Sequence, residues 1–190
     1  MVRVLGIDPG SRNTGWAVVD IKGRQYQYVD SGTLRLGDGD VAGRLKGIFE
    51  GITQLATLHQ PQEFAIEQAF MNKNADSALK LGQARGAAIC AAAMADLPVA
   101  EYAPRSVKQS VVGSGAAKKE QVQLMVSTLL KLPLETLQAD EADAIAVALC
   151  HAHYRQLGPL VDATDKVQLR KGRHGKRARG SSSWRSYVPD

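Results

Sequence analysis

Cysteines, aromatic side chains and long hydrophobic runs are scarce in this sequence. Two of the 190 residues are cysteines, and 5% are aromatic. Cys90 and Cys150 form neither a CxxC pair nor a cluster with histidine, so a zinc site of the usual spacing is excluded and two buried, reduced thiols are expected. The longest apolar stretch, residues 86–95, is shorter than the roughly 20 residues that a membrane-spanning helix needs. No signal-peptide core precedes Asp8, and we expect a cytoplasmic chain.

Positive charge is concentrated at one end of the chain. The formal net charge is +5, from 24 Lys and Arg against 19 Asp and Glu. Residues 166–190 contain eight of these basic residues and one acid, so the rest of the sequence is slightly acidic. A length of 190 residues suits one domain and leaves too few residues for a second. We expect a folded domain over residues 1–157 and a basic, disordered tail over residues 158–190, which either adds non-specific phosphate contacts or only aids solubility.

The hydrophobic pattern predicts an α/β fold in which strands come first. The first three strands are joined by short turns, and the later ones alternate with helices. This order predicts a mixed five-stranded sheet flanked by helices, and it is typical of ribonuclease H-like folds. Strands are expected over residues 2–8, 15–21, 25–36, 63–67 and 99–102, and helices over residues 41–59, 76–95, 105–112, 118–132 and 139–154.

Four acids stand where such a fold would bring them together. Asp8 and Glu67 end two strands that are expected to be parallel neighbours, so their carboxylates emerge at the same edge of the sheet. Asp140 and Asp143 are three residues apart and share one face of a helix, whereas Glu141 lies about 100° away and is given no role. Carboxylates without nearby histidine or cysteine are the donors that Mg²⁺ or Mn²⁺ prefers, and they disfavour zinc.

Each of these acids, taken alone, has a plainer explanation. An acid at a strand end is usually a turn former, and one near a helix N-terminus, such as Asp140, is usually a cap or a dipole partner. Glu67 and Asp143 are harder to explain in this way, because the residues around them are apolar. A carboxylate in apolar surroundings needs a partner, and a metal ion would provide one.

Four stretches of the sequence carry a family resemblance. They are Asp8-Pro9-Gly10-Ser11-Arg12 with Thr14-Gly15, Ala65-Ile66-Glu67-Gln68 with Phe70-Met71, residues 74–86, and Gln138-Ala139-Asp140 with Ala142-Asp143-Ala144. Together they resemble the RuvC family of Holliday junction endonucleases, over about residues 2–155. The resemblance implies a bacterial homodimer that cuts four-way DNA junctions in recombination and repair, with a RuvA–RuvB branch-migration complex as partner. It also implies that Asp8, Glu67, Asp140 and Asp143 are the catalytic, metal-binding residues.

These four acids would support phosphodiester hydrolysis with two metal ions. Two Mg²⁺ ions, or Mn²⁺ in their place, would lie about 3.5–4 Å apart on either side of the cut phosphate. One would activate a water molecule and the other would stabilise the leaving 3′ oxygen. Asp8 is the candidate to bridge both ions. The products would carry a 5′ phosphate and a 3′ hydroxyl.

DNA contacts are expected from other residues, because a cluster of acids repels DNA. Residues 73–131 carry a net positive charge within an otherwise acidic body. The resemblance singles out Lys108 and Lys119 as DNA-contacting residues, although solvated surface lysines are the alternative. Arg12, in the turn after Asp8, is a further candidate. The resemblance also implies that Phe70 stacks on a base near the junction centre, whereas the sequence alone leaves a place in the protein core equally open.

The helix over residues 76–95 is expected to contribute to a dimer interface. Two cuts related by a two-fold axis need a two-fold symmetric enzyme, and an isologous dimer supplies that symmetry. Gly82, Gly86 and the alanines at residues 91–93 would let a second helix approach closely. The same small residues could instead pack against the sheet.

Two other classes of function fit parts of the sequence. Residues 6–10, followed by a hairpin, are similar to the phosphate loop of actin-like ATPases and sugar kinases. That class needs two such domains around a nucleotide, and this length holds one. A non-enzymatic DNA-binding module would need the basic residues but not the four acids. Paired nicks in a synthetic four-way junction, in the presence of Mg²⁺, would separate the three classes.

Overall fold

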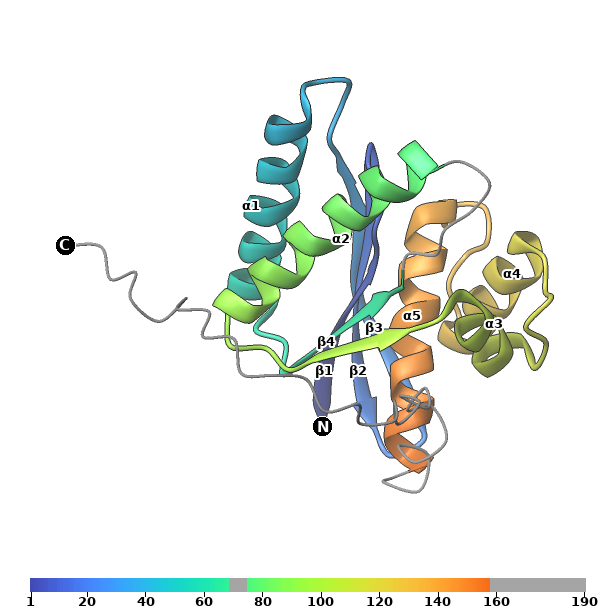
Figure 1. Cartoon of the computed structure of the whole chain (residues 1–190). Coiled ribbons are helices and arrows are strands. Elements are labelled where there is room, and N and C mark those ends of the chain that lie inside the picture. Colours follow the sequence, from blue (N-terminus) through green and yellow to red (C-terminus); the bar gives the residue numbers. More distant parts are fainter. Residues whose placement is uncertain (69–74, 158–190) are drawn as a thin grey trace, which may run out of the picture. The chain divides into compact units, whose positions relative to one another are not determined.

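The predicted strands and helices form in the chain order expected from the sequence. The computed structural model describes residues 1–68 and 75–157, so Phe70 and the predicted tail, residues 158–190, lie outside the described residues. The elements are β1 (Val2–Asp8), β2 (Asn13–Lys22), β3 (Gln25–Arg35), α1 (Val41–His59), β4 (Glu63–Glu67), α2 (Ala75–Met94), β5 (Val99–Tyr102), α3 (Pro104–Val112), α4 (Lys119–Leu130) and α5 (Ala139–Leu157) (Figure 1).

Most element boundaries follow directly from local sequence signals. α1 begins after Asp40, whose carboxylate accepts a hydrogen bond from the amide of Gly43. α4 is shorter than predicted at both ends. Lys118 is its N-cap in extended conformation, and Lys131 ends it in the left-handed region with φ 56°. α5 continues three residues past its predicted end at Tyr154.

The five strands form one mixed sheet, as predicted. Their order across the sheet is β3-β2-β1-β4-β5. β1 and β2 are antiparallel, as are β2 and β3, because tight turns join them. β1, β4 and β5 are parallel, since a helix crosses over between each successive pair. The central strand is therefore β1, which ends in Asp8, and its parallel neighbour β4 ends in Glu67.

Helices cover the sheet on both faces, and each face has its own hydrophobic core. α1 and α2 lie on one face, and α3, α4 and α5 lie on the other (Figure 1). Alternate residues of β1 point to opposite faces, so Leu5 and Ile7 pack under α1 and α2 while Val4 packs under α5. Asp8 continues this alternation toward the α5 face.

α2 corrects one expectation from the sequence. Cys150 is buried on α5, as predicted, but Cys90 on α2 is exposed, and both thiols are free. α2 is rich in alanine all round, so its sequence does not mark which side is buried. Its buried side consists of Ala84, Ala88, Ala91 and Ala92. Within residues 1–68 and 75–157, no helix is both long and apolar enough to span a bilayer.

Candidate active site

Asp8 and Glu67 are brought side by side by the two strands that they end. Ile7 of β1 is paired with Ile66 of β4 in the parallel ladder, so the next residue on each strand is an acid. Side chains point alternately to the two faces of the sheet along each strand. Ile7 and Ile66 both face α1 and α2, so the carboxylates that follow them both point toward α5. The negative charge of Asp8 contributes to a raised pKa at Glu67, as expected for neighbouring carboxylates.

Asp140 and Asp143 reach the same edge of the sheet because α5 packs very close to it. A β-carbon on Gly6 would stand 2.6 Å from the main-chain oxygen of Ala144, so glycine on β1 permits this approach. Both aspartates raise the pKa of Asp8 through charge repulsion. Glu141 points elsewhere, and its Oε2 accepts a hydrogen bond of 3.4 Å from the Ser31 hydroxyl of β3.

The electrostatics of this four-acid cluster favour protonation or a cation. Loss of water contacts, followed by repulsion from Asp143, raises the pKa of Asp8 to about 7. The pKa of Glu67 rises to about 8, mainly through burial and then through the charges of Asp8 and Asp143. Near neutral pH the carboxylates of the cluster therefore repel one another at a site where few water molecules can screen their charges.

Lys119 supplies a positive charge within the four-acid cluster. Its Nζ lies 2.8 Å from Oδ2 of Asp143, which is 20% exposed, and donates a hydrogen bond to it. That bond raises the pKa of Lys119, and the charges of Asp8 and Asp140 raise it further. Because Lys119 is the first residue of α4, this ion pair joins α4 to α5 at the cluster.

The donor set of the cluster suits a divalent metal ion. All four candidate ligands offer oxygen, and a cation would relieve the repulsion that raises the pKa of Asp8 and Glu67. Among the residues that the structure describes, no three acidic, histidine or cysteine side chains are gathered closely enough to hold an ion as they stand. In this arrangement Asp143 is bound to Lys119.

The turn that leaves β1 is held by one buried side chain. The Thr14 hydroxyl donates to the carbonyl of Gly10 at 3.0 Å and accepts from the amide of Gly10 at 3.3 Å. Thr14 is fully buried, and it fixes the path of the chain directly after Asp8. The only sequence signal for this role is the spacing of four residues between a turn glycine and a threonine, which sequence reasoning missed.

The predicted DNA-contacting residues lie at different distances from the four acids. Lys108, on α3, is close enough to lower the pKa of Glu67 by its charge. Lys119 contacts the cluster directly. Arg12 is exposed in the turn after Asp8 and forms an ion pair of 3.2 Å with Asp38. Phe70 falls between β4 and α2, outside the described residues.

Comparisons with known proteins agree with this arrangement. A protein from Shewanella sp. (strain W3-18-1) described as "Crossover junction endodeoxyribonuclease RuvC" is 58% identical over 156 residues, covering 82% of this chain and 90% of that protein. One of the same description from Photobacterium profundum is 55% identical over 175 residues, covering 92% of this chain and 99% of that protein.

Solved structures show the same fold. The structure described as "T. thermophilus RuvC in complex with Holliday junction substrate" superposes with a TM-score of 0.78 at 34% identity, covering 83% of this chain and 97% of that one. The yeast mitochondrial Holliday junction resolvase, at 14% identity and a TM-score of 0.57, shares the fold alone. The predicted ribonuclease H-like architecture is thereby confirmed. The profile of the family "Crossover junction endodeoxyribonuclease RuvC" matches residues 4–151, and this chain belongs to that family.

Proposed function

We propose that this chain is a metal-dependent endodeoxyribonuclease that resolves four-way DNA junctions by paired, symmetric nicks. The observation that carries the proposal is the convergence of four acids from β1, β4 and α5 at one edge of the sheet, where two of them have raised pKa values. Family membership and the junction-bound Thermus thermophilus relative support the choice of DNA substrate. In this proposal Asp8, Glu67, Asp140 and Asp143 are the catalytic residues.

The four acids would hold two Mg²⁺ ions, with Mn²⁺ as a substitute. When bound, such ions activate water and stabilise the charge that develops on the phosphate and on the leaving 3′ oxygen. Asp8 is central in the cluster and is the candidate for a ligand shared by both ions. Asp143 would have to exchange its contact with Lys119 for a contact with metal. The freed ammonium of Lys119, together with Lys108, would then be available to DNA phosphates.

Cleavage of a synthetic four-way junction tests the function directly. In Mg²⁺ the chain should produce two symmetric nicks with ligatable ends, and a linear duplex of the same sequence should remain intact. Asp8→Asn, Glu67→Gln, Asp140→Asn and Asp143→Asn should each abolish cleavage while junction binding survives, because they remove metal ligands and leave the basic surface unchanged. Near-normal cutting by any one variant would remove that residue from the site.

A homodimer would supply the two active sites that paired nicks require. The outer side of α2 favours this, because an added β-carbon on Gly82 or Gly86 meets no atom within 4 Å, and Leu79 and Met94 of the same helix are exposed. Ala84 and Ala88, in contrast, pack inward. Light scattering at micromolar concentration, with and without junction, should give twice the chain mass, and a monomer in both cases would contradict the proposal.

The cellular setting follows from the family and stays a proposal. We infer a bacterial cytoplasmic enzyme that acts with a RuvA–RuvB branch-migration complex, which moves the junction until a cleavable site is reached. The nuclease domain is proposed to end at residue 157, and the tail over residues 158–190 to add salt-sensitive phosphate contacts.

A further inference from the structure

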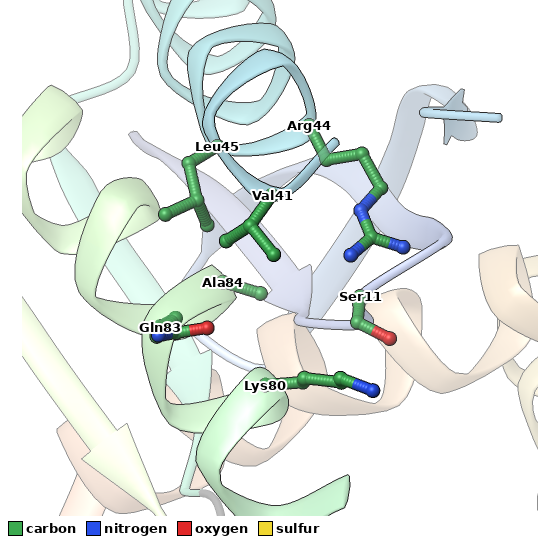
Figure 2. A pocket seen from close by; sticks show the side chains of 7 residues that line it. All are labelled: Ser11, Val41, Arg44, Leu45, Lys80, Gln83 and Ala84. Carbon is green, nitrogen blue, oxygen red and sulfur yellow. The ribbon is translucent and has the colours of Figure 1, made fainter. Parts of the chain in front are cut away.

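A small cleft with two basic residues lies beside the turn that follows Asp8. It is formed by that turn and by the first halves of α1 and α2. In Figure 2 the polar ends of Ser11, Arg44 and Lys80 lie on one side of the cleft, and the apolar side chains lie on the other. The lining residues are Ser11, Val41, Arg44, Leu45, Lys80, Gln83 and Ala84.

Arg44 stands out because it has no counter-ion in the cleft. Its side chain is half-buried there, and it pairs with no carboxylate within the described residues. A guanidinium without a protein counter-ion can form charge-assisted hydrogen bonds to an anion that enters the cleft. Several other arginines are paired: Arg3 with Asp20, Arg12 with Asp38, Arg85 with Glu101 and Arg155 with Glu63.

Lys80 is a second, weaker source of positive charge. Its Nζ lies 2.6 Å from Oδ2 of Asp76, one turn earlier on α2, and both side chains are substantially exposed. Exposed pairs of this kind contribute at most about 1 kcal/mol, so the ammonium can turn toward a bound anion at small cost. Asp76 offsets part of the charge of Lys80, so Arg44 is the stronger candidate to bind an anion in the cleft.

The cleft is small, and its polar side suits a phosphate group at its mouth. A phosphate would accept hydrogen bonds from the guanidinium of Arg44 and from the hydroxyl of Ser11. Contacts of this kind fix the position of a strand and carry no information about its base sequence.

We propose that this cleft binds the sugar-phosphate backbone of the DNA strand that enters the four-acid cluster, with Arg44 as its phosphate-binding residue. The proposal rests on the proposed function. It also answers a physical problem, since the acids repel the phosphate that they must act on. An anchor on the other side of the Asp8 turn would hold the strand in register while its scissile phosphate approaches the acids.

Arg44→Gln tests the proposal, with Lys46→Gln as the matched control. Both residues lie on α1 and both changes remove one positive charge, but Lys46 is 72% exposed and faces Glu50 rather than the cleft. Binding of a fluorescent four-way junction to the full chain would be measured without divalent metal between about 50 and 200 mM salt. Arg44→Gln should weaken binding about tenfold at the lower salt and reduce the slope of log K against log salt by about 0.9.

Lys46→Gln should leave both the affinity and the slope unchanged. Arg44→Lys should keep the slope, because the charge remains. Thermal unfolding of each variant shows whether the fold is intact, and Lys80→Gln repeats the test from α2 if Arg44→Gln does not fold. Equal binding and equal slopes for Arg44→Gln and Lys46→Gln would overturn the proposal. Failure of the proposed function would look different: the unmodified chain would bind the junction and not cut it in Mg²⁺.

Discussion

The main-chain carbonyl of Asp140 occupies the space that a side chain on Gly15 would need. A β-carbon built on Gly15 would stand 2.1 Å from the carbonyl oxygen of Asp140 and 2.8 Å from its carbonyl carbon. Gly15 is also the partner of Asp8 in the β1–β2 ladder. The absence of one methyl group therefore lets the start of α5 lie directly beside the strand that ends in Asp8.

Gly15→Ala should separate the acids without unfolding the chain. The clashing atoms belong to the backbone of α5, so the first turn of that helix would have to move. We expect junction cleavage to fall by about 100-fold, the cost of misplacing a catalytic group by about 1 Å. Single-turnover cleavage and circular dichroism would measure activity and folding. Gly39→Ala is the control, since its added β-carbon meets nothing within 4 Å, and equal cleavage by the two variants would contradict the argument.

The raised pKa values of Asp8 and Glu67 predict a stability that falls with pH. These carboxyls have pKa values of about 7 and about 8 in the folded chain, against ordinary values of 3.8 and 4.5. Between these limits the folded chain binds more protons than the unfolded chain, so the free energy of unfolding decreases as pH rises from about 4 to about 8. Thermal unfolding without divalent metal should show a lower Tm at pH 8 than at pH 5.5.

Asp8→Asn and Glu67→Gln should each flatten this pH dependence. Added Mg²⁺ should act in the opposite sense and raise Tm more at pH 8 than at pH 5.5, because the ligands must be deprotonated to bind it. If the difference in Tm between the unmodified chain and Asp8→Asn were the same at both pH values, the shifted titration of Asp8 would be wrong.

Lys119→Gln should destabilise the metal-free chain and weaken DNA binding. Its ammonium neutralises Asp143, and without it less positive charge opposes the repulsion among the four acids. We expect a loss of about 1 kcal/mol in the free energy of unfolding, a larger rise of Tm on adding Mg²⁺, and weaker junction binding. Denaturant unfolding and metal titration would measure the first two effects. Lys118 is the exposed N-cap residue next to Lys119, so Lys118→Gln is the control. It should change neither the free energy of unfolding nor the rise of Tm with Mg²⁺.

Phe70, predicted from the sequence to stack on a base, can be tested through the contrast between activity and stability. Stacking is worth about 1–3 kcal/mol per base, so Phe70→Ala should slow cleavage about ten- to hundredfold while Tm stays unchanged. Phe70→Tyr keeps the ring and should keep the activity. A core phenylalanine would behave differently, with a loss of about 3–5 kcal/mol of stability in the alanine variant.

The parts of the fold that local signals control could be predicted from the sequence. α1, β4 and β5 occupy the predicted residues, because Pro61, Pro98 and Pro104 lie at their boundaries and hydrophobic residues fill the segments. The neighbouring positions of Asp8 and Glu67 followed from the expected topology, since adjacent parallel strands end at the same edge of a sheet. The shared helix face of Asp140 and Asp143 followed from helical spacing.

Features that depend on tertiary contact could not be predicted in this way. The ion pair of Lys119 with Asp143 joins residues 24 apart, and sequence spacing does not specify such a contact. The exposure of Cys90 depends on which side of α2 meets the sheet, and an alanine-rich helix shows no strong apolar stripe to identify that side. The cleft at Arg44 combines residues from three separate segments, none of which carries a binding signal alone.

The place of α5 in the fold has a consequence for protein synthesis. This helix supplies two of the four acids, and its buried residues, from Ala144 to Cys150, complete the core over β1 and β2. A nascent chain that ends before residue 139 therefore lacks both Asp140 and Asp143, and one face of its sheet is left uncovered. With the catalytic roles proposed for Asp140 and Asp143, a translation product that lacks α5 should leave DNA uncut.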